Sequence, residues 1–158
     1  MKILFVCLGN ICRSPLAMAI MADKIHKRNL QAEVDSAGFE PFHRGDPADR
    51  RSVEVAAKHG IDLNHHTARL FNVRDFDRFD RIYVMDSMNH TDVMSLARSG
   101  EDEDKVDYIL NLLEPGKNRH VPDPWYGGLE GFEKVYQMLD KACDQLAGEI
   151  ETNHKHPR

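Results

Sequence analysis

Residues 2–15 read KILFVCLGNICRSP and decide the fold of this chain. The first five, Lys2 to Val6, make a short apolar and β-branched run that is typical of a buried strand. From Pro15 onward the pattern predicts a helix, with Ser14 as its N-cap and Pro15 at the first helical position. The segment is therefore a strand, a tight loop and a helix whose N-terminus points back at the strand end.

The loop between the two elements has the features of an anion site. Backbone N–H groups and the positive end of the helix dipole converge there, and the same field favours a thiolate at Cys7. Arg13 adds a planar fork of donors that suits a tetrahedral oxyanion. Gly9 allows the backbone to approach an anion closely or to take a positive φ, and Asn10 can lock the loop by hydrogen bonds. Ser14 can donate to the sulfur. We interpret Cys7 as a nucleophile toward phosphorus rather than a core cysteine.

The remaining chain alternates between strand-like and helix-like segments. We expect strands over 2–7, 33–36, 80–85 and 106–110, and helices over 15–29, 48–59, 87–98 and 130–150. This alternation predicts one doubly wound α/β domain, with a parallel four-stranded sheet, helices on both faces and right-handed crossovers. Ligands bind beyond the carboxyl ends of the strands in such folds, which is where the Cys7 loop falls.

The bulk properties exclude several classes of protein. A length of 158 residues suits one domain, and a net charge of −5 argues against general nucleic-acid binding. No apolar run approaches the roughly 20 residues that span a bilayer, and no signal peptide is visible. Three cysteines make no disulfide framework, so we expect a cytoplasmic protein. His59, His65 and His66 have poor spacing for a metal site, and we expect neither metal nor cofactor.

A second motif, VPDPWYGG, stands at residues 121–128. Its flanking prolines hold Asp123 in a stiff, extended loop. A carboxylic acid there can protonate the leaving oxygen of a phosphate monoester and, once ionised, activate water. Trp125 and Tyr126 can form an aromatic wall for a phenyl ring. The alternative is a turn-forming Asp-Pro with aromatic residues that only pack the loop against the core.

Together, CLGNICRSP at 7–15 and DPWYG at 123–127 resemble the low-molecular-weight protein tyrosine phosphatase family, and the resemblance extends over about residues 2–148. It implies that Cys7 is the nucleophile, that Arg13 binds phosphate and stabilises the transition state, and that Asp123 is the general acid and base. The other residues that it assigns to phosphate or substrate binding are Leu8, Gly9, Asn10, Ile11, Cys12, Ser14, Phe42, Trp125 and Tyr126.

The same resemblance assigns a supporting role to Ser36 and His66, in a network that shapes the phosphate-binding loop. For the sheet we expect the flavodoxin-like order 2-1-3-4. The phosphatase domain would occupy residues 1–150, followed by a polar tail over 151–158 that we expect to be frayed.

The other two cysteines receive separate interpretations. Cys12 lies across the loop from Cys7, near enough for a reversible disulfide that would protect the thiolate. Equally, Cys12 can be a small apolar residue that packs under the loop, and both interpretations stay open. Cys143 lies on the apolar face of the last helix, so we expect a core residue.

We therefore expect a metal-independent protein-tyrosine-phosphatase that acts through a phosphocysteine on phosphotyrosine proteins. Neither nucleic acid nor membrane would be a partner, and the chain would be a monomer or weak dimer. A protein-arginine phosphatase is one alternative, although the resemblance implies a small Thr where this chain has Ile11. An arsenate reductase would need a further cysteine pair near the third strand, and residues 78–100 contain none. A non-catalytic phosphate-binding module would need neither Cys7 nor Asp123.

Overall fold

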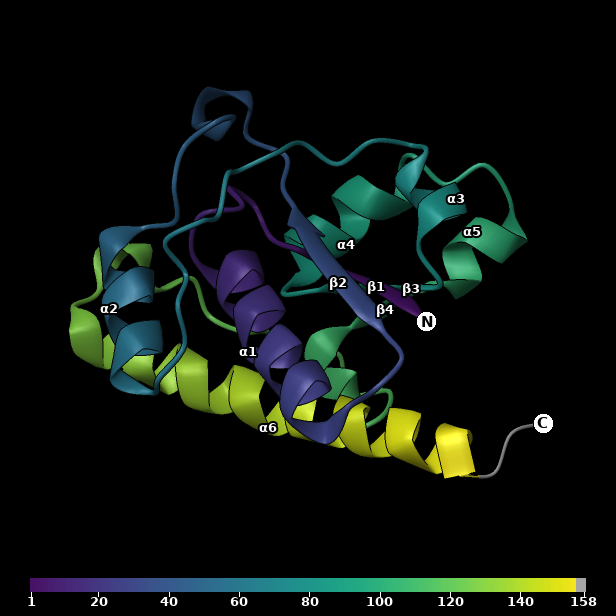
Figure 1. Ribbon diagram of the computed structural model, residues 1–158. Coiled ribbons are helices and arrows are strands. Elements are labelled where there is room, and N and C mark those ends of the chain that lie inside the picture. Colours follow the sequence, from purple (N-terminus) through teal and green to yellow (C-terminus); the bar gives the residue numbers. More distant parts are fainter. Residues whose placement is uncertain (156–158) are drawn as a thin grey trace.

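A parallel sheet of four strands organises the computed structural model, which describes residues 1–155 (Figure 1). The strands are β1 (Lys2–Val6), β2 (Glu33–Ala37), β3 (Arg81–Val84) and β4 (Val106–Tyr108). Their order is β2-β1-β3-β4, and every neighbouring pair is parallel. The expected fold class and strand order are confirmed.

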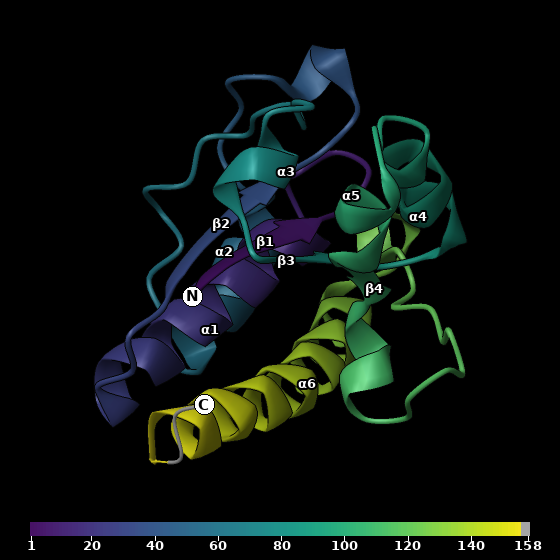
Figure 2. The ribbon, with the colours of Figure 1, turned by 90° about the vertical axis from the view of Figure 1, so that its right-hand side faces the viewer.

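Helices cover both faces of this sheet (Figure 2). One face carries α1 (Arg13–Arg28), α2 (Arg50–Lys58) and the long α6 (Leu129–Lys155). The other carries α3 (Asp75–Arg78), α4 (Ser87–Met94) and α5 (Gly100–Asp104). Three short 3₁₀ turns complete the described elements: η1 (Pro41–His43), η2 (Ile109–Leu112) and η3 (Pro124–Tyr126).

The central strand β1 divides the core into two apolar layers because alternate side chains of a strand point to opposite faces. Ile3 and Phe5 pack into the layer under α1 and α6. Leu4 and Val6 pack into the layer that contains Phe76 of α3. These four of the five β1 side chains are completely buried, so the strand that leads to Cys7 is held rigidly from both sides.

The start of α1 differs from the prediction. The helix begins at Arg13, its N-cap is Cys12, and no side chain caps it. The hydroxyl of Ser14 approaches the sulfur of Cys7 instead of a helix N–H, so the assignment of Ser14 as the N-cap is wrong. Pro15 falls in the first turn, where its missing N–H costs nothing because no helical partner precedes it.

The end of α6 also differs from the prediction, because the helix continues to Lys155. The expected fraying of residues 151–155 is therefore wrong, while 156–158 lie outside the described residues. Ile150 is buried just before this segment, and Glu149 pairs with Arg81 at 3.4 Å, so the turn that precedes residues 151–155 is anchored to the core and to β3. Elsewhere, α2, α4 and β4 are shorter than expected. Within residues 1–155, no helix is both long and apolar enough to cross a membrane.

Candidate active site

The loop of residues 7–13, here the Cys7 loop, joins the carboxyl end of β1 to the first turn of α1. Its first residue, Cys7, is buried. The sulfur of Cys7 lies 3.0 Å from the Ser14 hydroxyl and 3.4 Å from the Ser14 backbone nitrogen, whose N–H donates to it. The helix N-terminus is thus directed at the sulfur, as the sequence predicts.

Asn10 is the residue that shapes the Cys7 loop. Asn10 has a positive φ of 56°, a conformation that the sequence suggested for Gly9 instead. Gly9 lies against the His43 ring, and a Cβ added at Gly9 would be 3.1 Å from that ring. The Asn10 side-chain oxygen accepts the Arg69 backbone N–H at 2.9 Å, so its NH₂ group must face the other way. That group donates to the hydroxyl oxygens of Ser14 at 2.8 Å and of Ser36 at 2.9 Å.

His66 completes this network from the other side of the loop. Its Nε2 lies 2.7 Å from the Asn10 carbonyl oxygen. A carbonyl only accepts, so Nε2 carries a hydrogen and donates it. Burial lowers the pKa of His66, while the Asn10 hydrogen bond acts in the opposite direction. Asn10, Ser14, Ser36 and His66 therefore lie in one continuous hydrogen-bonded group.

Arg13 enters the site from α1 and is almost completely buried. Its Nη1 donates to Asp86 Oδ2 at 2.7 Å and to the Val121 carbonyl at 2.9 Å. Burial lowers the pKa of Arg13, but the nearby Cys7 and Asp86 more than offset that effect, so the net direction is upward. The guanidinium is thus a permanent cation of defined orientation beside the sulfur.

Sequence analysis missed the role of Asp86. This residue follows β3 and is the N-cap of α4, where its Oδ1 accepts the Asn89 N–H at 3.0 Å. Its other oxygen accepts from Arg13. The signal was visible, because a capping carboxylate just after a strand falls at the same sheet edge as the Cys7 loop.

Asp123 reaches the site from a distant part of the chain. Its Oδ1 accepts the Trp125 backbone N–H at 3.0 Å, at the start of η3. Its Oδ2 lies 3.9 Å from Arg13 Nη2. The carboxyl group therefore has one oxygen occupied by its own loop and one directed toward the Cys7 side.

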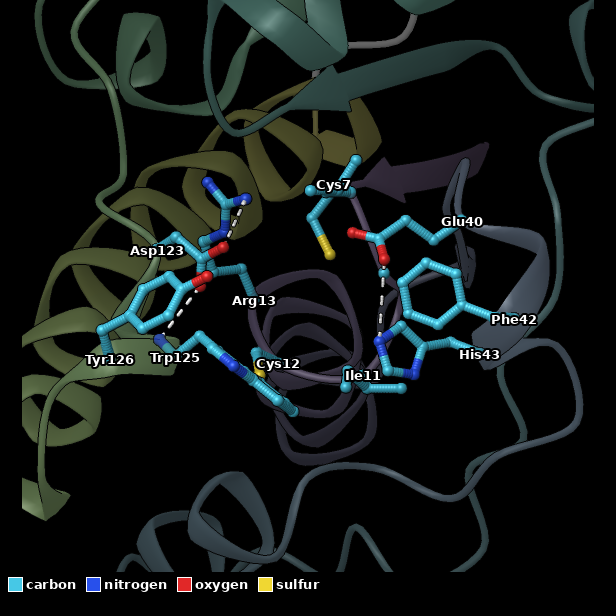
Figure 3. A pocket seen from close by; sticks show the side chains of 12 residues that line it. Cys7, Ile11, Cys12, Arg13, Glu40, Phe42, His43, Asp123, Trp125 and Tyr126 are labelled. Carbon is cyan, nitrogen blue, oxygen red and sulfur yellow. Dashed lines mark hydrogen bonds and ion pairs between the residues drawn. The ribbon is translucent and has the colours of Figure 1, made fainter.

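Figure 3 shows the Cys7 sulfur directed into a cavity of about 250 Å³, between Arg13 and Asp123 on one side and Glu40 and Phe42 on the other. The lining residues come from the Cys7 loop, the η1 region and the η3 region: Cys7, Leu8, Gly9, Ile11, Cys12, Arg13, Glu40, Phe42, His43, Asp123, Trp125 and Tyr126. The structure thus brings together most of the predicted site residues. Four predicted residues are not among those that line the cavity: Asn10, Ser14, Ser36 and His66.

The cavity mouth is aromatic and open. Phe42 is 73% exposed and Tyr126 is 95% exposed, while Trp125 is partly covered. Glu40 and His43, which sequence analysis did not identify, share the Phe42 side of the cavity. Their only sequence signal was their proximity to Phe42.

A family model described as "Low molecular weight phosphotyrosine protein phosphatase" matches residues 2–156. The chain belongs to this family. A putative low molecular weight protein-tyrosine-phosphatase of Synechocystis sp. is 44% identical over 148 residues, which is 92% of this chain and 94% of that protein.

Solved structures agree with this family assignment. A protein tyrosine phosphatase from Entamoeba histolytica, with Hepes in its active site, superimposes with a TM-score of 0.89 at 36% identity, over 98% of this chain and 99% of that chain. The YwlE arginine phosphatase, solved as a mutant with a phosphorylated active-site serine, gives a TM-score of 0.86 at 26% identity, over 98% and 99%. The resemblance inferred from the two motifs is confirmed.

The remaining thiols of this low molecular weight phosphatase are buried, and all three cysteines are free. Burial raises the pKa of Cys12, and burial also raises that of Cys143 to about 12. Cys143 lies in the core, as expected. The Cys7–Cys12 disulfide stays a prediction. Across residues 1–155, no group of three or more His, Cys, Asp or Glu could hold a metal ion.

Proposed function

We propose that this chain is a protein-tyrosine-phosphatase that hydrolyses phosphotyrosine through a phosphocysteine. One observation carries the proposal: the Cys7 sulfur is directed into an aromatic-rimmed cavity that Asp123 also lines (Figure 3). A nucleophile, a fixed cation and a carboxylic acid then surround the space that a phosphate monoester would occupy.

In the first step, the substrate phosphate takes its place between the amides of the Cys7 loop and Arg13. The Cys7 sulfur attacks phosphorus, an S–P bond forms, and the bond from phosphorus to the phenolic oxygen breaks. Asp123 donates a proton to that oxygen. Since Oδ1 accepts the Trp125 N–H, the transferable proton is carried on Oδ2.

In the second step, the ionised Asp123 takes a proton from a water molecule, whose oxygen attacks the phosphocysteine. The S–P bond breaks, and inorganic phosphate and a Cys7 thiolate remain. The Ser14 hydroxyl, 3.0 Å from the sulfur, would stabilise the thiolate as it leaves.

The cavity mouth supports an aryl substrate. Phe42 and Tyr126 stand on opposite sides of it and can contact the phenyl ring of phosphotyrosine (Figure 3). Ile11 occupies the loop position where the resemblance implies a small Thr in arginine phosphatases, which favours tyrosine. The shared fold with YwlE makes phosphoarginine the alternative to test. A cytoplasmic location and a monomer or weak dimer are further parts of this proposal.

A panel of phosphotyrosine, phosphoserine and phosphoarginine peptides tests the substrate class. We expect turnover of the phosphotyrosine peptides alone. Preferential turnover of phosphoarginine peptides would show that phosphoarginine, and not phosphotyrosine, is the substrate. Cys7→Ser should abolish turnover and keep inorganic phosphate binding; substantial residual activity would exclude Cys7 as the nucleophile.

A further inference from the structure

Arg51, in the first turn of α2, connects two loops that are distant in sequence. Its Nη1 donates to two carbonyl oxygens of the segment that follows Asp123, those of Trp125 and Gly127, both at 2.9 Å. The guanidinium carbon lies 5.4 Å from the centre of the Trp125 ring and 4.5 Å from that of Phe132. Arg51 thus contacts the η3 turn through hydrogen bonds and through its flat face.

The opposite side of the Arg51 guanidinium is held by Asp49, the N-cap of α2. Asp49 Oδ1 accepts from Arg51 Nε at 3.1 Å, and Oδ2 accepts from Nη2 at 3.1 Å. The same Oδ1 accepts the Arg51 backbone N–H at 2.8 Å, so the cap and the ion pair share one carboxylate. A bidentate pair of this kind restricts the orientation of the guanidinium.

Asp49 is in turn attached to the Cys7 loop. Its backbone N–H donates to the Ile11 carbonyl oxygen at 2.7 Å. One series of contacts therefore runs from Ile11 to Asp49, to Arg51 and to Trp125. At its far end, the Trp125 N–H donates to Asp123 Oδ1. The peptide groups of Trp125 thus connect Arg51 to the carboxyl group of Asp123.

We propose that Arg51 is a positioning residue, which holds the Asp123 carboxyl group in register with the Cys7 loop so that its proton reaches the leaving oxygen. The inference rests on the role of Asp123 in the proposed function. Arg51 is not among the residues that line the cavity, so it acts through Trp125 and not on the substrate. Lys could not replace it, because an ammonium group lacks the planar fork that serves Asp49 and two carbonyls together.

The test uses Arg51→Met, which keeps an apolar stem but removes every donor, and Arg51→Lys, which keeps the charge. Arg50→Met is the matched control, since the side chain of the neighbouring Arg50 is 91% exposed and pairs with Glu54 of its own helix. The measurement is kcat/KM for a series of aryl phosphates, from acidic nitrophenols to phenols that leave poorly. Good leaving groups depart without protonation, whereas poor ones need the proton from Asp123.

Arg51→Met should lower kcat/KM for poor leaving groups by about ten- to a hundredfold and for nitrophenols by no more than about twofold, since misplacement of a catalytic group by an ångström has effects of this size. Arg51→Lys should show the same steeper dependence, and Arg50→Met should match the wild type. A uniform loss across the series would overturn the proposal, because a loss of folded protein affects all substrates equally.

Two further measurements separate this inference from the proposed function. In an Asp123→Asn background, Arg51→Met should have no additional effect on poor leaving groups, and a persisting effect would overturn the positioning role. If Asp123→Asn alone does not change how kcat/KM depends on the leaving group, the proposed role of Asp123 as the proton donor is wrong instead. Trp125 is the single tryptophan, so quenching of the protein's fluorescence by acrylamide reports how exposed its ring is. Quenching should be stronger in Arg51→Met than in the wild type, and unchanged in Arg50→Met.

Discussion

The hydroxyl oxygen of Ser14 lies 3.0 Å from the sulfur of Cys7, and Asn10 determines how that hydroxyl is used. Asn10 donates to the Ser14 oxygen at 2.8 Å, so the single hydroxyl hydrogen is left for another acceptor. Two acceptors lie within reach of this hydroxyl: the Cys7 sulfur at 3.0 Å and the Ala37 carbonyl oxygen at 3.4 Å. The geometry favours donation to the sulfur.

Ser14→Ala removes this donor, so we expect kcat to fall by about ten- to a hundredfold, the equivalent of one hydrogen bond to a charged group. Cys7 should also react more slowly with iodoacetate at neutral pH, because the thiolate loses its donor. Ser95→Ala, which removes a hydroxyl that donates to the Asp92 carbonyl oxygen in the last turn of α4, is the control. If iodoacetate alkylated Cys7 of the Ser14→Ala variant at the wild-type rate, the assignment of Ser14 as a donor to the sulfur would be contradicted.

Asp86→Asn keeps an oxygen for the cap of α4 but removes the negative charge that orients Arg13. We expect the inhibition constant of inorganic phosphate to rise and kcat/KM to fall by about tenfold or more, because the NH₂ group that replaces Oδ2 cannot accept a hydrogen bond from Arg13. Thermal unfolding, measured in parallel, shows whether the fold survives. Unchanged phosphate inhibition would mean that Arg13 does not need Asp86.

Gly38 allows β2 to pass close to the Cys7 loop. A Cβ at Gly38 would lie 2.8 Å from both the Asn10 backbone nitrogen and the Leu8 carbonyl oxygen. Gly38→Ala should therefore destabilise the protein by about 1–3 kcal/mol, as overpacking does, and reduce activity with it. Gly148→Ala in α6 has open space around it and should be stabilising by about 0.5–1 kcal/mol. Urea unfolding of both variants should give opposite signs; the same sign for both would contradict the close approach.

His66→Gln tests, through the pH dependence of stability, the partly buried imidazole that donates to the Asn10 carbonyl oxygen. Burial lowers the pKa of His66 below the ordinary value of about 6.5. Between the two pKa values the unfolded chain binds more protons, so the stabilisation is complete above about 6.5 and is lost as the pH falls through the folded value. The stability gap between wild type and His66→Gln should narrow on acidification. Urea midpoints over this range measure it, with the exposed His65→Gln as control, and a constant gap would contradict the prediction.

Local sequence patterns predicted the elements that a few neighbouring residues determine. The run from Lys2 to Val6, the loop after it and the following helix were all visible, because strand alternation and helix starts depend on near neighbours. The strand order followed from the alternation of elements and from the resemblance. The prediction of Ser14 as the N-cap of α1 was wrong because the Ser14 hydroxyl interacts with the Cys7 sulfur, across the loop, instead of with a helix N–H.

The sequence by itself determined that Cys7 stands where a strand ends and a helix begins, and the two motifs indicated the residues for the chemistry. Tertiary structure alone decided what holds them in register. Arg13 bonds to the Val121 carbonyl 108 residues away, Arg51 reaches Trp125 across 74 residues, and Asn10 takes the conformation that Gly9 had suggested. Such contacts form only after the sheet and helices have packed, and no local pattern encodes a hydrogen bond to a distant carbonyl.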